Sequence, residues 1–176
     1  MSMIVPDTKN WTWVLERPCA DCGFDAEEIA YAAVPERTLD SAARLGAALE
    51  RADARVRPDD ATWSVLEYGA HVRDVCRIFE TRVALMCDGD GVEPARFAGW
   101  DQDATAIADR YDEQDPARVA EELAAAAERI AATFAAVPAD RLEYRGARSD
   151  GSAFTVVSLS RYFLHDLVHH VHDVRG

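Results

Sequence analysis

SVLEYGAHVRDVCRIFETRVALM, residues 64–86, carries the clearest pattern in the chain. Its apolar side chains recur every three or four residues over about six turns, which is the spacing of one face of an α-helix. Ser64 and Glu67 have the spacing of a capping box, in which two side chains satisfy backbone N–H groups at a helix start. The stretch predicts a long helix that starts at Ser64, with apolar positions at Val65, Tyr68, Val72, Val75, Ile78, Phe79, Val83 and Met86.

Three more helices are expected around this one. Helical periodicity runs over 37–56 and stops at RPDD, residues 57–60. Asp115 followed by Pro116 is a typical helix start, and that helix should end before Pro138. A last helix is expected over 155–174.

The expected fold class is therefore all-α: a four-helix bundle over residues 36–176, preceded by an N-terminal arm, residues 1–35. The segment 88–114 is too long for a tight turn and suits a crossover connection or a loop that covers a site. Trp100, Asp101 and Tyr111 are candidate lid residues, and the alternative is that the aromatic ones plug the end of the bundle. Strand signals are scarce, apart from a short hairpin expected at SDGS, residues 149–152.

Size and charge limit the possible partners. A chain of 176 residues is expected to form one domain. Its net charge of -13 would repel nucleic acids and anionic membranes, and no apolar run reaches the roughly 18 residues of a membrane span. The first residues lack the pattern of a secretory signal, and four cysteines are too few for a disulfide framework, so a cytoplasmic protein is expected. The sequence leaves the oligomeric state open between a monomer and a homodimer.

Four of the five histidines lie in HDLVHHVHD, residues 165–173. At about 100° per residue, His165, His169 and His172 share one strip of the last helix. Two histidines four residues apart can bind one ion, and His71 lies on the interior side of the second helix. Ion pairs of His169 with Asp173, and of His170 with Asp166, on a solvated helix face explain the same spacing. Local spacing leaves both interpretations open.

Two motifs resemble a known family. WSVLEYGAHVRDV, residues 63–75, and LSRYFLHDLVHHVHDV, residues 159–174, are similar to the DinB-like superfamily of metal-binding four-helix bundles, which includes the N-terminal domain of mycothiol-dependent maleylpyruvate isomerase. The resemblance implies an up-down-down-up bundle with a long connection between the second and third helices. It also implies a divalent ion, zinc or nickel, with open coordination positions.

Carried over residue by residue, the implied ligands are His71, His165 and His169. His172 lies outside the family motif, and His170 is interpreted as structural. Three neutral nitrogen ligands leave room for water or substrate, as in catalytic sites.

The family's chemistry implies activation of a low-molecular-weight thiol, such as mycothiol, for transfer to or isomerisation of a small electrophile. A hydrolase and a non-catalytic metal-binding bundle are the alternatives. Glu67 is a candidate general base, with the capping-box acid as its other interpretation. Arg161 and Tyr162, one turn before the first ligand of the last helix, are candidates for contacting substrate, or simply part of a polar helix face.

Cys19 and Cys22 in RPCADCGFD, residues 17–25, have the separation of zinc knuckles and of dithiol redox sites. Cys76 and Cys87 do not have the spacing of a second pair. No complete site can be assembled from the cysteines, and the role of the pair stays open.

Overall fold

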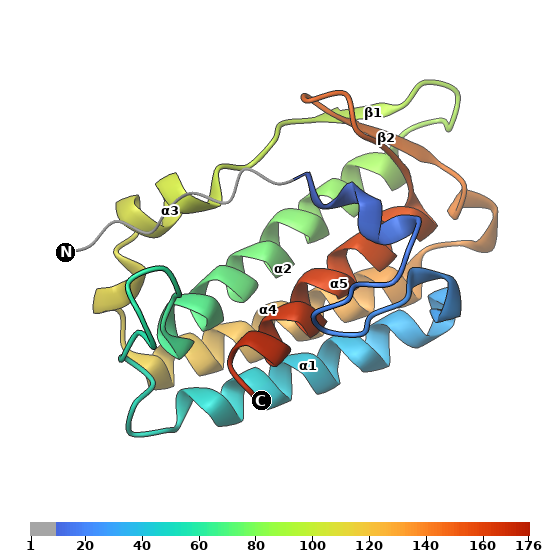
Figure 1. Cartoon of the computed structure of the whole chain (residues 1–176). Helices are drawn as coiled ribbons and strands as arrows, with labels where there is room; N and C mark the ends of the chain where they lie inside the picture. The colour runs from blue at the N-terminus through green and yellow to red at the C-terminus, as the bar shows by residue number, and fades with distance from the viewer. Residues whose placement is uncertain (1–9) are drawn as a thin grey trace.

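A computed structural model describes residues 10–176 of the chain. Four long helices form a bundle, which confirms the predicted all-α four-helix fold: α1 (Val34–Leu49), α2 (Val65–Asp88), α4 (Pro116–Ala136) and α5 (Val156–Asp173). In Figure 1, α1 and α5 run in one direction while α2 and α4 run in the other, so the order is up-down-down-up. Because α2 and α4 are parallel, the chain between them must cross the length of the bundle.

The starts of α2 and α4 follow the predicted capping residues, and α5 has a capping box that was not predicted. Ser64 and Glu67 form both halves of a capping box at α2, and Asp115 accepts a hydrogen bond from the N–H of Arg118 at the start of α4. Thr155 and Ser158 form a second capping box at α5. These local hydrogen bonds satisfy N–H groups that a helix leaves unpaired in its first turn.

Helix α1 differs from its predicted range of 37–56, because it begins at Val34 and ends at Leu49. After it, the chain turns back and Ala54 becomes buried against the start of α2, where the N–H of Leu66 donates to its carbonyl at 2.8 Å. This tertiary contact ends the helix before the apolar periodicity does.

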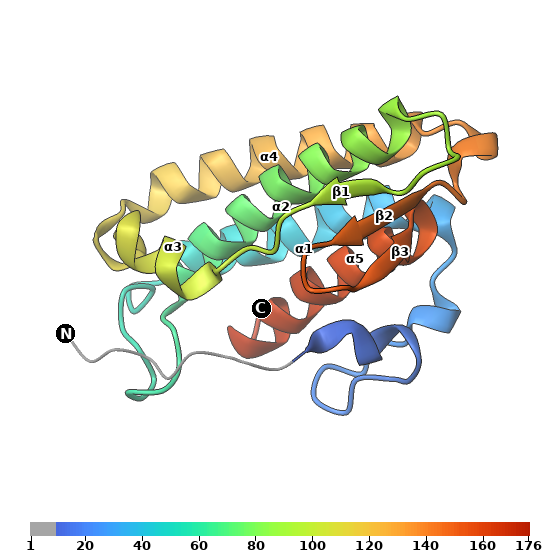
Figure 2. The ribbon, with the colours of Figure 1, turned by 90° about the horizontal axis from the view of Figure 1, so that it is seen from above.

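The connections carry a small sheet that the sequence only partly indicated. Strands β2 (Arg145–Arg148) and β3 (Ala153–Thr155) form an antiparallel hairpin around the predicted turn, where Gly151 has a φ of +92°. Strand β1 (Ala95–Phe97), from the connection between α2 and α4, pairs with β2 in parallel. Figure 2 shows this sheet beside α2 and α5. The connection continues through α3 (Gln102–Ala108) and a short 3-10 helix, Tyr111–Glu113.

The chain before α1 packs along α5 (Figure 1). It includes three 3-10 turns, at Trp11–Leu15, Ala26–Glu28 and Tyr31–Ala33. The Arg161 Nε on α5 donates to the carbonyl of Ile29 at 3.0 Å, and the Tyr31 hydroxyl donates to the carbonyl of Phe134 at 2.8 Å. The described part of the predicted arm therefore belongs to the packed body, while its first nine residues lie outside the described residues.

The core lies between the four long helices. Its largest fully buried apolar side chains are Leu45, Leu66, Met86, Tyr111, Leu123, Ile130, Phe134, Leu159, Phe163, Leu164 and Leu167. Among residues 10–176, no helix is both long enough and apolar enough to span a bilayer.

Candidate metal centres

Helix α5 presents two neighbouring rows of possible metal ligands. His165 and His169 form one row, and Asp166 and His170 form the other, one residue further along. Because successive residues of a helix are about 100° apart, the two rows point in different directions. In the described part of the chain, each row joins a different group of ligand atoms.

The first group, called here the His71 site, consists of His71, Asp166 and His170. Its ligand atoms all lie within 4.8 Å of one another. The Oδ1 of Asp166 is 3.3 Å from the Nε2 of His71 and 3.4 Å from the Nε2 of His170. Three side chains from two helices thus converge on one point inside the bundle.

Because these polar side chains are buried, bringing them together is energetically unfavourable unless a cation binds them. His71 is 1% exposed, and neither of its ring nitrogens makes a hydrogen bond of acceptable geometry. The Oδ1 of Asp166 is likewise buried without such a bond, although the Asp166 side chain as a whole is 31% exposed. Buried polar atoms without hydrogen bonds are destabilising, and coordination of a cation would satisfy them.

The protonation states suit a divalent ion. Burial lowers the pKa of His71, and the nearby Asp166 carboxylate only partly opposes this, so the imidazole is neutral at pH 7. Burial alone would raise the pKa of Asp166, but its interactions with the His71 and His170 side chains stabilise the carboxylate and lower that pKa to about 2. Neutral imidazole and ionised carboxylate are the forms that bind zinc and similar ions.

Neighbouring side chains orient the two imidazoles. The Oδ2 of Asp173 lies 2.8 Å from the Nδ1 of His170, which places the ring proton there and directs the Nε2 lone pair toward the site. Trp100 stacks on His71, with ring centroids 5.2 Å apart and planes 8° from parallel. The Trp100 indole N–H donates to the Thr105 hydroxyl at 2.7 Å. The predicted lid residue Trp100 therefore covers a ligand of the site.

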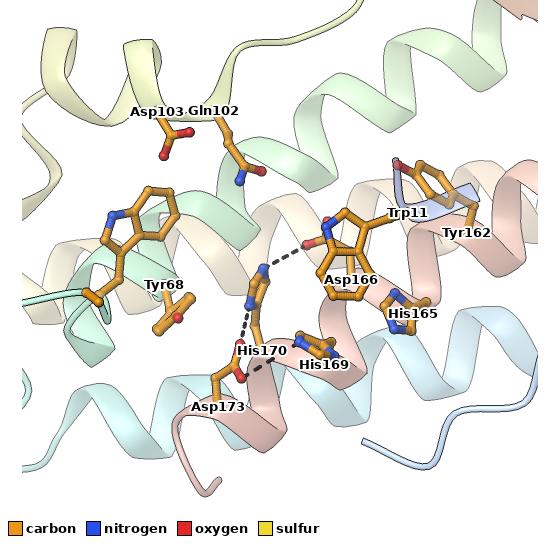
Figure 3. A pocket seen from close by; sticks show the side chains of 12 residues that line it. Trp11, Tyr68, Gln102, Asp103, Tyr162, His165, Asp166, His169, His170 and Asp173 are labelled. Carbon is orange, nitrogen blue, oxygen red and sulfur yellow. Dashed lines mark hydrogen bonds and ion pairs between the residues drawn. The ribbon is translucent and has the colours of Figure 1, made fainter. Parts of the chain in front are cut away.

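A pocket of about 310 Å³ opens beside the His71 site (Figure 3). Two of the three ligands, Asp166 and His170, form part of its wall, so a small molecule in the pocket can approach the site. Aromatic side chains come from the N-terminal segment and from the region around the start of α2, and α3 supplies Gln102 and Asp103. The lining residues are Trp11, Ala61, Trp63, Tyr68, Gln102, Asp103, Tyr162, His165, Asp166, His169, His170 and Asp173.

The second group, called here the cysteine site, consists of Cys19, Cys22, His165 and His169. All four ligand atoms lie within 4.8 Å of one another, and the Cys19 Sγ is 3.7 Å from the Nδ1 of His169. Burial lowers the pKa of His165 to about 4, and the neighbouring His169 adds to this effect. The sequence alone had given the cysteine pair no partners, because the histidines lie more than a hundred residues away.

The structure does not bring the predicted ligands together as one group. His71 pairs with Asp166 and with His170, which was interpreted as structural, whereas His165 and His169 face the cysteines. His172 is exposed. The ion pairs considered as an alternative are present at 3.4 and 3.8 Å, but they sit at the wall of a pocket rather than on a fully solvated face.

The predicted catalytic residues have different surroundings. Glu67 is buried in the capping box and forms an ion pair with Arg57, whose side chain donates from Nε at 3.0 Å, so its carboxylate is fully engaged. The Arg161 side chain donates a hydrogen bond to the carbonyl of Ile29 and so contacts the N-terminal segment. Tyr162 lines the pocket, and its hydroxyl accepts a hydrogen bond from Arg148 at 3.3 Å.

Sequence reasoning missed Asp166 and His170 as candidate ligands, although a signal existed. These two residues have the same spacing of four as His165 and His169. Aspartate is as suitable a ligand as histidine for many divalent ions. The choice between the rows depends on how α5 is rotated against α2, which local spacing does not encode.

Comparison with known proteins agrees with this fold. A model of the DinB superfamily matches residues 32–174. YfiT from Bacillus subtilis, described as a probable metal-dependent hydrolase with an unusual four-helix bundle topology, has a similar structure with a TM-score of 0.70. The two chains are 18% identical, and the match covers 85% of this chain and 88% of YfiT. No curated protein sequence matches the chain.

Proposed function

The chain belongs to the DinB superfamily, and from that membership and the geometry of the His71 site we propose that it is a metal-dependent enzyme that acts on a small molecule. The observation that carries this proposal is the convergence of His71, Asp166 and His170 beside a pocket. Two histidines and one carboxylate form a ligand set of catalytic zinc sites. Three protein ligands leave coordination positions free for a reactant.

A divalent ion held there, zinc or nickel in our proposal, would lower the pKa of a water or thiol and polarise a carbonyl group. The chain's own residues determine what can enter. The side chains of Trp11, Trp63 and Tyr68 offer apolar surface for part of a substrate. The carboxylates of Asp103 and Asp173 disfavour an anionic substrate. The pocket therefore suits a neutral or cationic small molecule with an apolar part.

Tyr162 is the proposed proton donor on the pocket wall. Because its hydroxyl oxygen accepts a hydrogen bond from the Arg148 guanidinium, its own proton is free to be donated to an oxygen of the substrate. In this proposal Glu67 and Arg161 have structural roles, since their polar groups are engaged within the protein.

Hydrolysis is the reaction we propose first. The description of YfiT as a probable metal-dependent hydrolase supports it, as does the acidic pocket, which disfavours an anionic thiol such as glutathione. Transfer of a low-molecular-weight thiol of the mycothiol type is the second candidate. It is supported by the similarity of the two helix motifs to mycothiol-dependent enzymes.

The test measures ion content and turnover together. Protein purified without chelator or affinity metal is assayed with neutral esters, amides and epoxides, with and without added thiol. His71→Ala should lose the ion of the His71 site and reduce turnover more than about 100-fold, since even indirect partners of a metal commonly contribute 10–100-fold. The exposed His172→Ala serves as the control and should retain both.

The pattern of turnover separates the candidates. Turnover without thiol supports hydrolysis, and turnover that requires thiol supports transfer. Wild-type protein that binds the ion but turns over none of these substrates under either condition would favour a non-catalytic metal-binding bundle and contradict the proposal.

A further inference from the structure

We propose that Cys19, Cys22, His165 and His169 form a second, structural zinc site that fastens the N-terminal segment to α5. This inference is independent of the proposed function, because none of these residues belongs to the His71 site. It gives the cysteine pair a role that neither cysteine spacing nor the family match assigns.

The geometry agrees with a tetrahedral zinc site. With Zn–S bonds of about 2.3 Å and Zn–N bonds of about 2.0–2.1 Å, neighbouring ligand atoms lie about 3.3–3.8 Å apart. The Cys19 Sγ and the His169 Nδ1 are separated by 3.7 Å, and all four ligand atoms fall within 4.8 Å of one another. The spacings Cys-x2-Cys and His-x3-His are also those of structural zinc sites with two cysteines and two histidines.

A tight turn presents both thiols on the same side. The N–H of Gly23 donates to the carbonyl of Cys19 at 2.8 Å, and the N–H of Cys19 donates to the carbonyl of Phe24 at 2.8 Å. Gly23 has a φ of +74°, a conformation that side-chain-bearing residues rarely adopt. This closed loop orders the cysteines next to the histidine row of α5.

The surroundings leave polar atoms that an ion would satisfy. Cys19 is 1% exposed and His165 is 4% exposed, and the Nε2 of His165 is buried without a hydrogen bond. The rings of Trp11 and Phe24 pack against His165, with centroids 5.6 and 5.4 Å away. Burying the Cys19 thiol and the His165 imidazole in this way is unfavourable unless their polar atoms find a partner.

Four protein ligands make the site structural rather than catalytic. A closed coordination shell has no position for a reactant, so the ion would stabilise the attachment of the N-terminal segment. Trp11 lies in this segment, contacts His169 at 5.1 Å between ring centroids, and forms part of the pocket wall. The zinc site would therefore hold one wall of the pocket in place.

Cobalt replaces zinc as the spectroscopic probe in the test. Reduced, metal-stripped full-length protein is titrated with Co²⁺, which gives a near-ultraviolet charge-transfer band only when thiolates bind it. Wild type should show this band, and the double variant Cys19→Ser/Cys22→Ser should lose it together with one equivalent of ion. Cys87→Ser is the matched control, because Cys87 belongs to neither group, and it should keep the band.

Two further variants keep the test decisive. Cys22→His retains a ligand and should still bind cobalt tetrahedrally with a weaker thiolate band, which separates loss of coordination from loss of folding. His71→Ala should keep the full thiolate band while losing the other ion, so the two sites can fail independently. Amide hydrogen exchange at Cys19 and Gly23 should accelerate when the wild type is stripped of metal.

The proposal is overturned if the reduced wild-type protein shows no thiolate band when it is titrated with Co²⁺. It is equally overturned by a double cysteine variant that binds Co²⁺ with an unchanged spectrum and stoichiometry. A dithiol redox role would produce the first of these outcomes, together with a reversible Cys19–Cys22 disulfide.

Discussion

Asp173 shows how a single residue can support the proposed metal centre without itself being a proposed ligand. Its carboxylate contacts the Nδ1 of His170 at 2.8 Å, and it lies 3.8 Å from the Nε2 of His169. Burial would raise its pKa, but the hydrogen bond with His170 lowers it, so the group is ionised at neutral pH. An ionised partner fixes the tautomer of His170 and increases its basicity as a ligand.

Replacing Asp173 with asparagine should therefore weaken the His71 site. We expect zinc affinity to fall about 10–100-fold, because the partner that orients the ligand is lost while the ligand itself remains. Calorimetric titration in the Cys19→Ser/Cys22→Ser background measures this site alone. His172→Ala in the same background is the control, and equal affinities for the two variants would contradict the role given to Asp173.

At the scale of the elements, the connection between α2 and α4 is attached to the bundle by a buried polar cluster. Asp74 on α2 accepts hydrogen bonds from Arg73 at 2.9 Å and from the hydroxyl of Tyr111 at 2.7 Å. Arg73 also reaches Gln114 and Glu122, at 2.8 and 2.9 Å. The cluster positions the end of this connection. Earlier residues of the same connection, in α3, form part of the pocket wall.

Tyr111→Phe should lower the free energy of unfolding by about 1.5–3 kcal/mol at pH 7, the usual range for a hydrogen bond to a charged group. Burial alone would raise the pKa of Asp74, but its bonds with Arg73 and Tyr111 lower it. A lowered folded-state pKa means that the stabilisation is complete above the unfolded value of about 3.9 and is lost as the pH falls through the folded value.

Urea denaturation of wild type and Tyr111→Phe at several pH values measures both effects. The difference between the two proteins should be constant between pH 6 and 8 and should shrink in acid below about pH 4. A difference that grows in acid would show that Tyr111 does not bind the ionised form of Asp74.

At the scale of the whole molecule, the net charge determines which classes of partner the protein attracts or repels. A net charge of -13 creates a negative potential around the protein, and the pocket itself carries Asp103, Asp166 and Asp173. Such a field attracts cations and repels phosphate backbones. The proposed partners are accordingly a metal ion and a neutral or cationic small molecule, with no nucleic acid and no anionic membrane.

Direct binding to DNA provides the test at this scale. In a gel-shift assay at low salt, where electrostatic binding is strongest, we expect no retarded complex at micromolar protein. A shift that weakens steeply with added salt would mean that a basic surface outweighs the net charge.

The sequence by itself determined the helices and the family. The capping residues of α2, α4 and α5 and the apolar periodicity between them are local signals, because helix hydrogen bonds join residues only four apart. The parallel pairing of β1 with β2 was not predictable, since it joins two short segments about fifty residues apart with weak patterns of their own. The early end of α1 was likewise decided by packing against α2.

Only the tertiary structure decided which ligands meet. Residues 165, 166, 169 and 170 provide two overlapping pairs at the same spacing, and a rotation of α5 by about 100° would exchange them. The packing of α5 turns Asp166 and His170 toward His71, and the fold of the N-terminal segment brings the cysteines to His165 and His169. A helix period sets which residues share a face, but contacts with distant parts of the chain determine what each face meets.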